Sequence, residues 1–279
     1  GVVGFFAISW LMKYITSHSL LPFAGYCLFL GAGSLLLLTL NPQNSLNATA
    51  STAVNSEAVY QVDFQPELEW LLPVMNNCQQ ELPEQEFIYQ PAASISAAGN
   101  SQDVYFSYGL PEGNPQFVYQ IGEDHLELVI HPSNSLQQIP LPAVDSLFAG
   151  RIPTWQNLAE SCAECFSNPG SASNLSIVVW TLPEDTLPGS QFRSHYLNSP
   201  VSSLSKIAPT SRLLRQMIAA DVNAIGVLPA GWVDGSVKIL AINPDNWSPP
   251  VFPIIAVTPV QPDENLSLWL ACVQKSTAR

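Results

Sequence analysis

Residues whose types and spacing could support chemistry are few in this sequence, and the densest group lies in one short segment. His125 and His131 lie near Glu123, Asp124 and Glu127, and together these residues could form a metal cluster or an acid–base set. The segment also has the pattern of a strand, and polar residues are common at strand ends. We therefore favour a polar strand edge over a catalytic or metal-binding cluster.

A second group is the adjacent pair Ser194 and His195, which could suggest a nucleophile and its base. Consecutive residues of a helix point to different faces, so we expect no catalytic pair. The sequence also lacks the G-x-S-x-G, Walker A, H-E-x-x-H and G-x-G-x-x-G motifs. It indicates no catalytic residues and no cofactor, and it leaves open whether a longer parent protein is an enzyme.

The cysteines suggest an exported domain. Cys78, Cys162, Cys165 and Cys272 lie in the polar part of the chain, whereas Cys27 lies in an apolar run. An even number of exported cysteines permits two disulfides. The C-x-x-C pair has no second pair or neighbouring His to complete a zinc site, so we expect a small loop disulfide between Cys162 and Cys165 and no metal.

Hydrophobic periodicity predicts an α/β domain over residues 59–279, because short β-like runs alternate with helical ones. The expected strands are Val59–Phe64, Phe87–Tyr89, Val104–Tyr108, Phe117–Ile121, Leu126–His131, Ile177–Leu182, Ala224–Leu228 and Val237–Ile242. The expected helices are Glu67–Leu82, Pro142–Phe148, one beginning near Gln191, one from Thr210 or Ser211 to Ala220, and Asn265–Gln274.

Polar loops at the carboxyl ends of two predicted strands are candidate ligand sites, because open α/β sheets bind ligands there. Asp63 and Gln65 lie at the end of the first strand, and residues 181–191 follow the strongest one and lead into a helix. Glu184 and Asp185 in that loop would repel phosphate. A simple Pro-Gly turn with a helix cap explains the loop equally well.

Composition narrows the classes of function. The chain has 279 residues and a formal net charge of −13, with nine Lys and Arg. Nucleic-acid binding needs clustered basic residues, so we do not expect it. The length suits a short membrane part and one medium-sized domain.

The first forty residues predict two transmembrane helices, one within residues 1–15 and one over Leu20–Leu40, where no charged residue occurs. An uncleaved signal anchor or a signal peptide is the alternative. Lys13 lies between the two runs and the next basic residue is Arg151, which places the acidic domain outside the cell membrane. Residues 41–58 are small and polar, and we expect a flexible linker there.

Three blocks of the domain carry a resemblance to a known family. Leu147–Asn157 (LFAGRIPTWQN), Ile177–Leu197 (IVVWTLPEDTLPGSQFRSHYL) and Asp221–Val233 (DVNAIGVLPAGWV) match, in order and spacing, motifs of other proteins. Residues 59–275 thereby resemble the extracytoplasmic substrate-binding proteins of phosphate-type ABC transporters. The resemblance implies the two-lobed periplasmic-binding-protein type II fold, a small ligand held between the lobes, hinge closure and a possible membrane transporter as partner.

This resemblance carries over to only some positions. Gly150, Trp155 and Gly226 match structural positions of the family. The resemblance implies a small ligand of the oxyanion class, but the family's Gly-Ser-Gly-Thr loop, which binds phosphate, is replaced here by residues that include Glu184, Asp185, Thr186 and Ser190. With Asp63, these four residues are the candidate ligand-binding set. The fold also implies that its first and last helices meet in one lobe, which leads us to expect a Cys78–Cys272 disulfide.

Residues 6–31 (FAISWLMKYITSHSLLPFAGYCLFLG) carry a second resemblance, to the C-terminal end of undecaprenyl-diphosphate phosphatases. That family's catalytic motifs lie upstream of this stretch and are not in the present sequence. The alternative function is therefore a fragment of such a phosphatase with an accessory outer domain.

Overall fold

A computed structural model describes residues 59–93, 103–111, 115, 117–172, 174–243 and 247–278. The chain divides into Gly1–Ser56 and Glu57–Arg279, and the fold below is that of the second unit. The predicted transmembrane helices over residues 1–40 and the linker over residues 41–58 lie outside the described residues. Within the described ranges, no helix is both long and apolar enough to cross a membrane.

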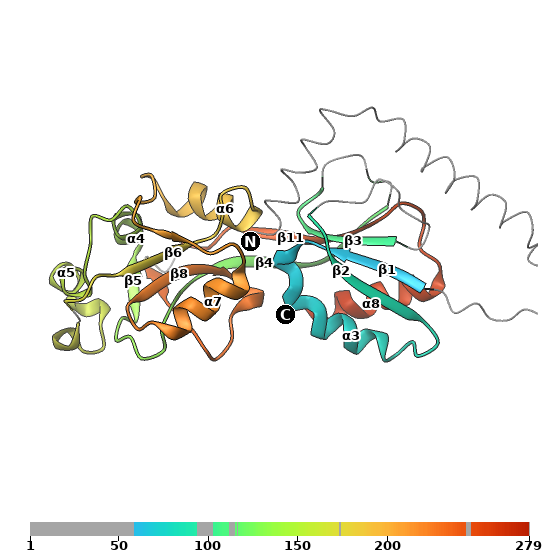
Figure 1. Ribbon diagram of the computed structural model, residues 1–279, viewed down its shortest axis with the longest axis horizontal. Helices are drawn as coiled ribbons and strands as arrows, with labels where there is room; N and C mark the ends of the chain where they lie inside the picture. The colour runs from blue at the N-terminus through green and yellow to red at the C-terminus, as the bar shows by residue number, and fades with distance from the viewer. Residues whose placement is uncertain are drawn as a thin grey trace, which may run out of the picture. The chain divides into compact units, whose positions relative to one another are not determined.

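The first lobe contains both ends of the described domain (Figure 1). Its strands lie in the order β2-β1-β3-β11-β4, and β1, β2 and β3 are parallel to one another. The strands are β1 (Val59–Phe64), β2 (Glu86–Pro91), β3 (Asp103–Tyr108), β11 (Val251–Thr258) and the first part of β4 (Phe117–Ile130). The helices are η2 (Pro66–Leu71), α3 (Leu72–Gln79) and α8 (Glu264–Thr277).

The second lobe is a continuous stretch of chain that begins partway along β4. There β4 pairs with β8, and β6 and β7 continue the sheet. The strands are β5 (Gln138–Pro140), β6 (Val178–Thr181), β7 (Lys206–Ile207), β8 (Ala224–Pro229), β9 (Lys238–Ile239) and β10 (Ala241–Asn243). The helices are α4 (Leu141–Phe148), α5 (Trp155–Ser161), η3 (Ala163–Cys165), η4 (Pro169–Ser171), α6 (Leu187–Tyr196), α7 (Ser211–Ala220) and η5 (Ala230–Trp232).

Local sequence explains several element boundaries. Thr154, Thr186, Thr210 and Asp263 stand at helix N-caps, where each side chain accepts a hydrogen bond from a backbone N–H of the first turn. Pro66 begins η2, where its missing N–H costs nothing. These signals lie at the starts of helices, and the starts of α7 and α8 agree with the sequence prediction to within a residue.

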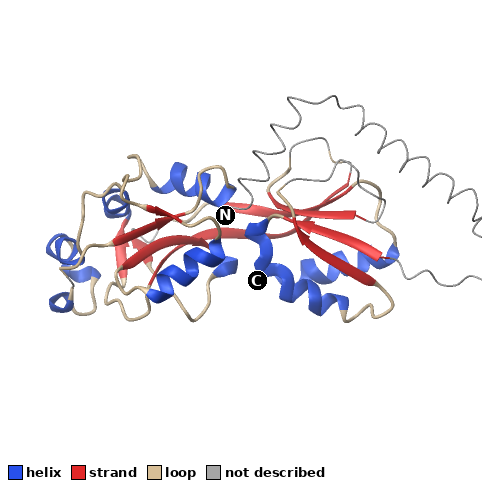
Figure 2. Ribbon diagram, in the orientation of Figure 1, coloured by secondary structure: helices blue, strands red, loops and turns tan. Residues whose placement is uncertain are grey.

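Helices cover the two lobes differently (Figure 2). In the first lobe α3 and α8 pack on one face of the strands, where Tyr60, Val62 and Phe64 of β1 are buried. In the second lobe α6 and α7 cover opposite faces of the sheet. Adjacent residues of β8 therefore pack into separate hydrophobic clusters: Val227 faces the α6 side and Leu228 the α7 side. β8 is therefore covered on both faces, which matches its continuous apolar run.

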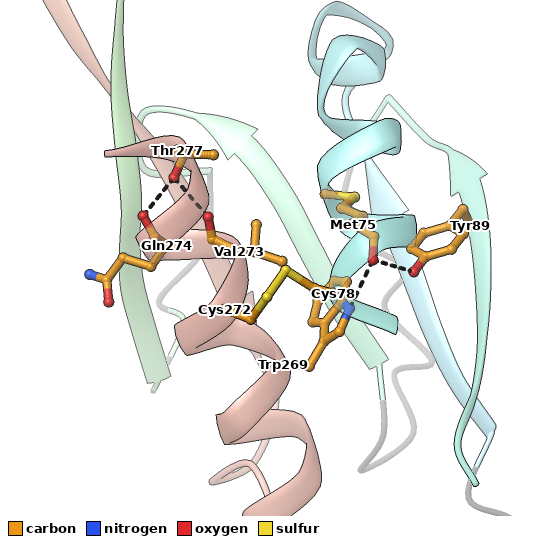
Figure 3. Close-up of a disulfide and its surroundings, with 8 residues drawn as sticks. All are labelled: Met75, Cys78, Tyr89, Trp269, Cys272, Val273, Gln274 and Thr277. Atoms are coloured by element: carbon orange, nitrogen blue, oxygen red, sulfur yellow. Dashed lines mark hydrogen bonds between the residues drawn. A yellow bond between two sulfur atoms is a disulfide. The ribbon is translucent and has the colours of Figure 1, made fainter. Parts of the chain in front are cut away.

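The disulfide Cys78–Cys272 joins α3 to α8 across 194 residues of sequence, as expected (Figure 3). Beside it the fully buried Trp269 donates a hydrogen bond to the Met75 carbonyl at 3.3 Å and stacks on Phe87. The second expected disulfide, Cys162–Cys165, closes a short turn after α5. Both pairings confirm the cysteine predictions.

The three residues matched to structural positions of the family have packing roles. Gly150 follows α4 with φ +78°, which favours glycine. Gly226 lies where a Cβ would come within 2.9 Å of Leu214 Cδ2, so glycine lets β8 approach α7 closely. Trp155 is buried in the second lobe.

Several predictions about elements were wrong. The predicted strand Val237–Ile242 is divided between two short strands, β9, which pairs with β4, and β10, which pairs with β5. Residues 117–130 form one continuous strand, β4, rather than two, because its halves pair with different partners, β11 and β8. The strand β11 was not predicted, since Pro253 interrupts its pattern. The helix α6 begins at Leu187, four residues before the expected start, because the Thr186 hydroxyl caps it.

Candidate functional site

The two lobes meet at an interlobe junction formed by the carboxyl ends of their strands. The first lobe contributes η2, the end of β3 and the middle of β4, while the second contributes the β6–α6 loop, the start of α7, and η5. The junction residues used below are Gln65, Glu67, Glu69, Trp70, Tyr108 and Asp124 in the first lobe, and Asp185, Arg212, Gly231 and Trp232 in the second.

Two tryptophans make the closest contacts across the junction. The Trp232 indole N–H donates to the Glu67 carbonyl at 2.7 Å. The Trp70 ring lies directly over Gly231, where a Cβ would fall 2.1 Å from Trp70 Cε2. Only glycine leaves room for this ring, so the contact depends on a single residue type.

Asp124 lies at the centre of a hydrogen-bond network that joins the lobes. It is 3% exposed, its Oδ2 accepts from the Tyr108 hydroxyl at 2.7 Å, and its Oδ1 accepts from the N–H of His125 at 2.8 Å and of Gly231 at 3.3 Å. Trp70 Nε1 donates to the Tyr108 hydroxyl at 3.1 Å. Burial raises the pKa of Asp124, although these hydrogen bonds oppose the rise.

The junction is acidic on the first-lobe side. Burial raises the pKa of Glu67, and the charge of Asp185 from the second lobe raises it further. The two carboxylates therefore repel each other across the junction. Arg212 at the start of α7 forms an ion pair with Glu69 of η2, which supplies the opposite charge.

A cavity of about 530 Å³ lies beside the junction and is lined by both lobes. The first lobe supplies Trp70, Glu123, Asp124 and His125, and the second lobe supplies Gly231. The remaining lining residues are Gln120, Ile121, Gly122, Ala230, Val251, Gln274, Thr277 and Ala278. Its volume suits a small ligand, since ligand pockets measure about 300–1,000 Å³.

The predicted ligand loop does not form a phosphate-type donor site. The Thr186 hydroxyl accepts from Gly189 N at 3.2 Å and donates to the Pro183 carbonyl at 2.7 Å. The Ser190 hydroxyl donates to the Leu187 carbonyl at 3.0 Å. Both hydroxyl protons are used within the loop and helix, so neither is free to donate to an anion.

Asp63 lies apart from Glu184 and Asp185, the other acidic members of the predicted set. Asp63 Oδ1 accepts from Gln61 Nε2 at 2.9 Å on the strand face away from α3 and α8. Glu184 is exposed, its nearest cation is Arg193 at 3.8 Å, and it lines a separate cavity of about 410 Å³ in the second lobe. Of the five predicted residues, Asp185 alone acts on a junction residue: its charge raises the pKa of Glu67.

His125 and His131 make different contacts. His125 Nε2 lies 3.0 Å from Glu127 Oε1, while His131 Nδ1 accepts from Ser133 N in the turn after β4. Within the described residues these histidines belong to no group of three or more candidate metal ligands. The interpretation as a polar strand edge fails for Asp124, which is buried at the junction.

The expectation that Ser194 and His195 point to different faces of their helix was wrong. Ser194 Oγ lies 2.9 Å from His195 Nδ1, because both side chains fold back along the helix toward the Gln191 carbonyl. The same hydroxyl also donates to the Ser190 carbonyl at 2.9 Å. The Ser194 hydroxyl thus lies within hydrogen-bonding distance of two backbone carbonyls as well as of the His195 ring.

Sequence reasoning missed Glu67, Trp70, Tyr108, Gly231 and Trp232. Their signal was position, because Tyr108 ends a predicted strand and the other four follow one. The segment Pro229–Trp232 lies within the block that carried the family resemblance, but only the structure places it against η2.

No protein-family model matches the sequence, and no curated protein is detectably similar to it. Solved structures share its fold. A phosphate ABC transporter substrate-binding protein from Clostridium perfringens, with bound phosphate, is 15% identical with a TM-score of 0.57, over 77% of this chain and 92% of that one. The reduced OxyR regulatory domain from Pseudomonas aeruginosa is 11% identical with a TM-score of 0.51, over 78% and 98% of the two chains.

A third similar structure is the CcmR regulatory domain of Synechocystis PCC6803 in complex with 2-PG, at 12% identity and a TM-score of 0.50, covering 79% of this chain and 97% of that one. These similarities bear on the fold alone. They bear out the expectation of a fold like that of periplasmic binding proteins, which the neighbours use for both transport and regulation.

Proposed function

We propose that residues 59–279 form a membrane-tethered, extracytoplasmic solute-binding domain that holds a small ligand between its two lobes. The observation that carries the proposal is the cavity of about 530 Å³ lined by both lobes at the junction. Ligands of α/β proteins bind where strand ends meet, and binding there can couple to hinge motion through β4. The two disulfides support an oxidising, extracytoplasmic location.

The lining favours a neutral or positively charged polar solute, such as a sugar or an amine. Glu123 and Asp124 place two carboxyl groups on the cavity, with the Trp70 ring as an apolar wall. Aromatic faces bind sugars and cations through the same surface. The carboxylates repel oxyanions, so we expect phosphate to bind poorly despite the resemblance.

A thermal-shift screen of Glu57–Arg279, which forms a compact unit with its own core, tests the proposal. The solutes are phosphate, sulfate, sugars, amino acids and polyamines. A ligand at a hundred times its Kd adds about 2.7 kcal/mol, so one class should raise the melting temperature by several degrees. Stabilisation by phosphate alone would reject the charge argument, and stabilisation by none would reject the solute-binding role.

Two variants localise the site. Trp70→Ala should weaken binding of the stabilising solute about tenfold, equivalent to about 1.4 kcal/mol, because it removes the apolar wall. Glu81→Gln removes an exposed carboxylate at the end of α3, which does not line the cavity, and should leave the affinity unchanged. Equal effects of both variants would place the ligand elsewhere.

A further inference from the structure

The contacts across the interlobe junction are made by protein groups alone. Trp232 hydrogen-bonds to the Glu67 carbonyl, the Trp70 ring covers Gly231, and Arg212 pairs with Glu69. These contacts involve η2 on one side and η5 and α7 on the other. None of them requires a ligand to form.

We infer that these contacts form an interlobe latch, which holds the domain closed on its own and makes opening, rather than closure, the step that a ligand or partner must control. The latch comprises Glu67, Glu69 and Trp70 with Arg212, Gly231 and Trp232. It concerns access to the proposed site, because Trp70 and Gly231 also line the cavity of about 530 Å³.

The buried Asp124 connects residues of the two lobes at the latch. It sits on β4, the strand that passes from one lobe into the other, and accepts from Tyr108 of the first lobe and Gly231 of the second. Gly231 lies opposite Asp124 beyond the Leu126–Pro229 pair of the β4–β8 ladder, and the Asp124 carboxylate is 3% exposed. Buried polar groups resist losing their partners, so Asp124 holds Gly231 in place beneath the Trp70 ring, and opening must break the contacts of the two tryptophans.

Charge distribution also favours closure. Among the described residues, the first lobe has Lys275 as its one Lys or Arg, whereas the second has Arg151, Arg193, Lys206, Arg212, Arg215 and Lys238. Arg212 and Arg215 project from the start of α7, and Arg212 meets the acidic η2. Opposite charges on facing surfaces draw the lobes together.

Interlobe distances in the full chain test the latch by pulsed electron spin resonance without added ligand. Spin labels attached through p-acetylphenylalanine at Leu204 and Leu268 report one exposed position in each lobe and spare the cysteines. We expect one narrow distance distribution for the unsubstituted chain. Gly231→Ala, whose Cβ meets the Trp70 ring, should shift the distribution to longer distances.

Matched variants separate opening from misfolding. Gly235→Ala adds the same methyl group where nothing lies within 4 Å, and it should leave the distances unchanged. The double variant Gly231→Ala with Trp70→Ala lacks the ring that the added methyl group meets, so its interlobe distance distribution should differ from that of Gly231→Ala alone. If Gly231→Ala simply misfolded, removing the Trp70 ring would not relieve the defect. Near-ultraviolet circular dichroism checks that each variant keeps its core.

A broad or long distance distribution in the unsubstituted chain, unaltered by Gly231→Ala, would overturn the latch. That outcome is independent of the proposed function, because no ligand enters the experiment. Conversely, a failed ligand screen together with the expected distances would reject solute binding and leave the latch standing.

Discussion

The two lobes are tied internally by different means. The first lobe is assembled from both ends of the domain, and Cys78–Cys272 locks α3 to α8 across 194 residues. The second lobe is a continuous stretch whose disulfide spans three residues of sequence, and its longer tie is polar: Asp145 of α4 accepts from the N–H groups of Asn198 and Ser199 after α6. The first lobe therefore needs both ends of the domain in place, while the second is formed within one continuous stretch of chain.

The largest contrast should come from removing each disulfide. Replacing Cys78 and Cys272 by Ser should lower the free energy of unfolding by about 5 kcal/mol, because the bond closes a loop that contains the whole second lobe. Replacing Cys162 and Cys165 by Ser should cost about 2 kcal/mol, since that loop is short. Urea unfolding of the two double variants measures both values, and equal losses would contradict the comparison.

The next effect concerns the aromatic core of the first lobe. Trp269→Ala should destabilise by about 3–5 kcal/mol, because the fully buried ring packs on Phe87 and Phe106. The neighbouring Leu268 is 55% exposed on the same helix, so Leu268→Ala should change stability by less than about 0.5 kcal/mol. Chemical denaturation of both variants tests whether the core, rather than α8 in general, carries the stability.

Asp145 should stabilise the second lobe in a pH-dependent way. Burial would raise its pKa, but hydrogen bonds from Ser199 and Asn198 and the Arg151 guanidinium outweigh it and lower the pKa from 3.8 to about 2. Because the folded-state pKa is depressed, this stabilisation is present above pH 3.8 and is lost as pH falls toward about 2. Asp145→Asn should cost about 2 kcal/mol at pH 7.

Stability measured between pH 2 and pH 7 checks this expectation. The unsubstituted protein should lose more stability on acidification than Asp145→Asn does. Glu160→Gln, at an exposed position of α5, serves as the control and should follow the unsubstituted protein. Parallel pH profiles for all three proteins would remove Asp145 as the tie.

The smallest effect should come from the ion pair between the lobes. Arg212 is half exposed, so Arg212→Gln should lower stability by less than about 1 kcal/mol, and added salt should reduce the difference. A double-mutant cycle with Glu69→Gln isolates the pairwise contribution. A coupling energy of several kcal/mol would mean that charge, rather than the tryptophans, dominates the junction.

Much of this architecture could be predicted from local sequence. Alternating hydrophobicity predicted β1, a hydroxyl cap at Thr210 or Ser211 located α7, and amphipathic periodicity located α8. The pairing of Cys78 with Cys272 followed from a family resemblance. Each of these rests on patterns within about one element or on a known fold.

The site could not be predicted in the same way, because it depends on contacts between distant segments. Asp124 has the pattern of an exposed strand residue, yet the bulge opposite Ile254 and Ile255 and the arrival of Gly231 bury it. β11 escaped notice because Pro253 argues against a strand. The sequence of the loop at Thr186 contains hydroxyl groups that could bind a ligand, but in the structure these hydroxyls form hydrogen bonds within the loop and the helix.

The most direct test of the central claim is ¹⁹F NMR of the protein labelled with 5-fluorotryptophan, titrated with the solute that the thermal screen identifies. Signals are assigned by single Trp→Phe variants at Trp70, Trp155 and Trp269. We predict that the Trp70 signal shifts saturably, while those of Trp155 and Trp269, in the cores of the two lobes, stay in place. A saturable solute that leaves the Trp70 signal unmoved would contradict a binding site between the lobes.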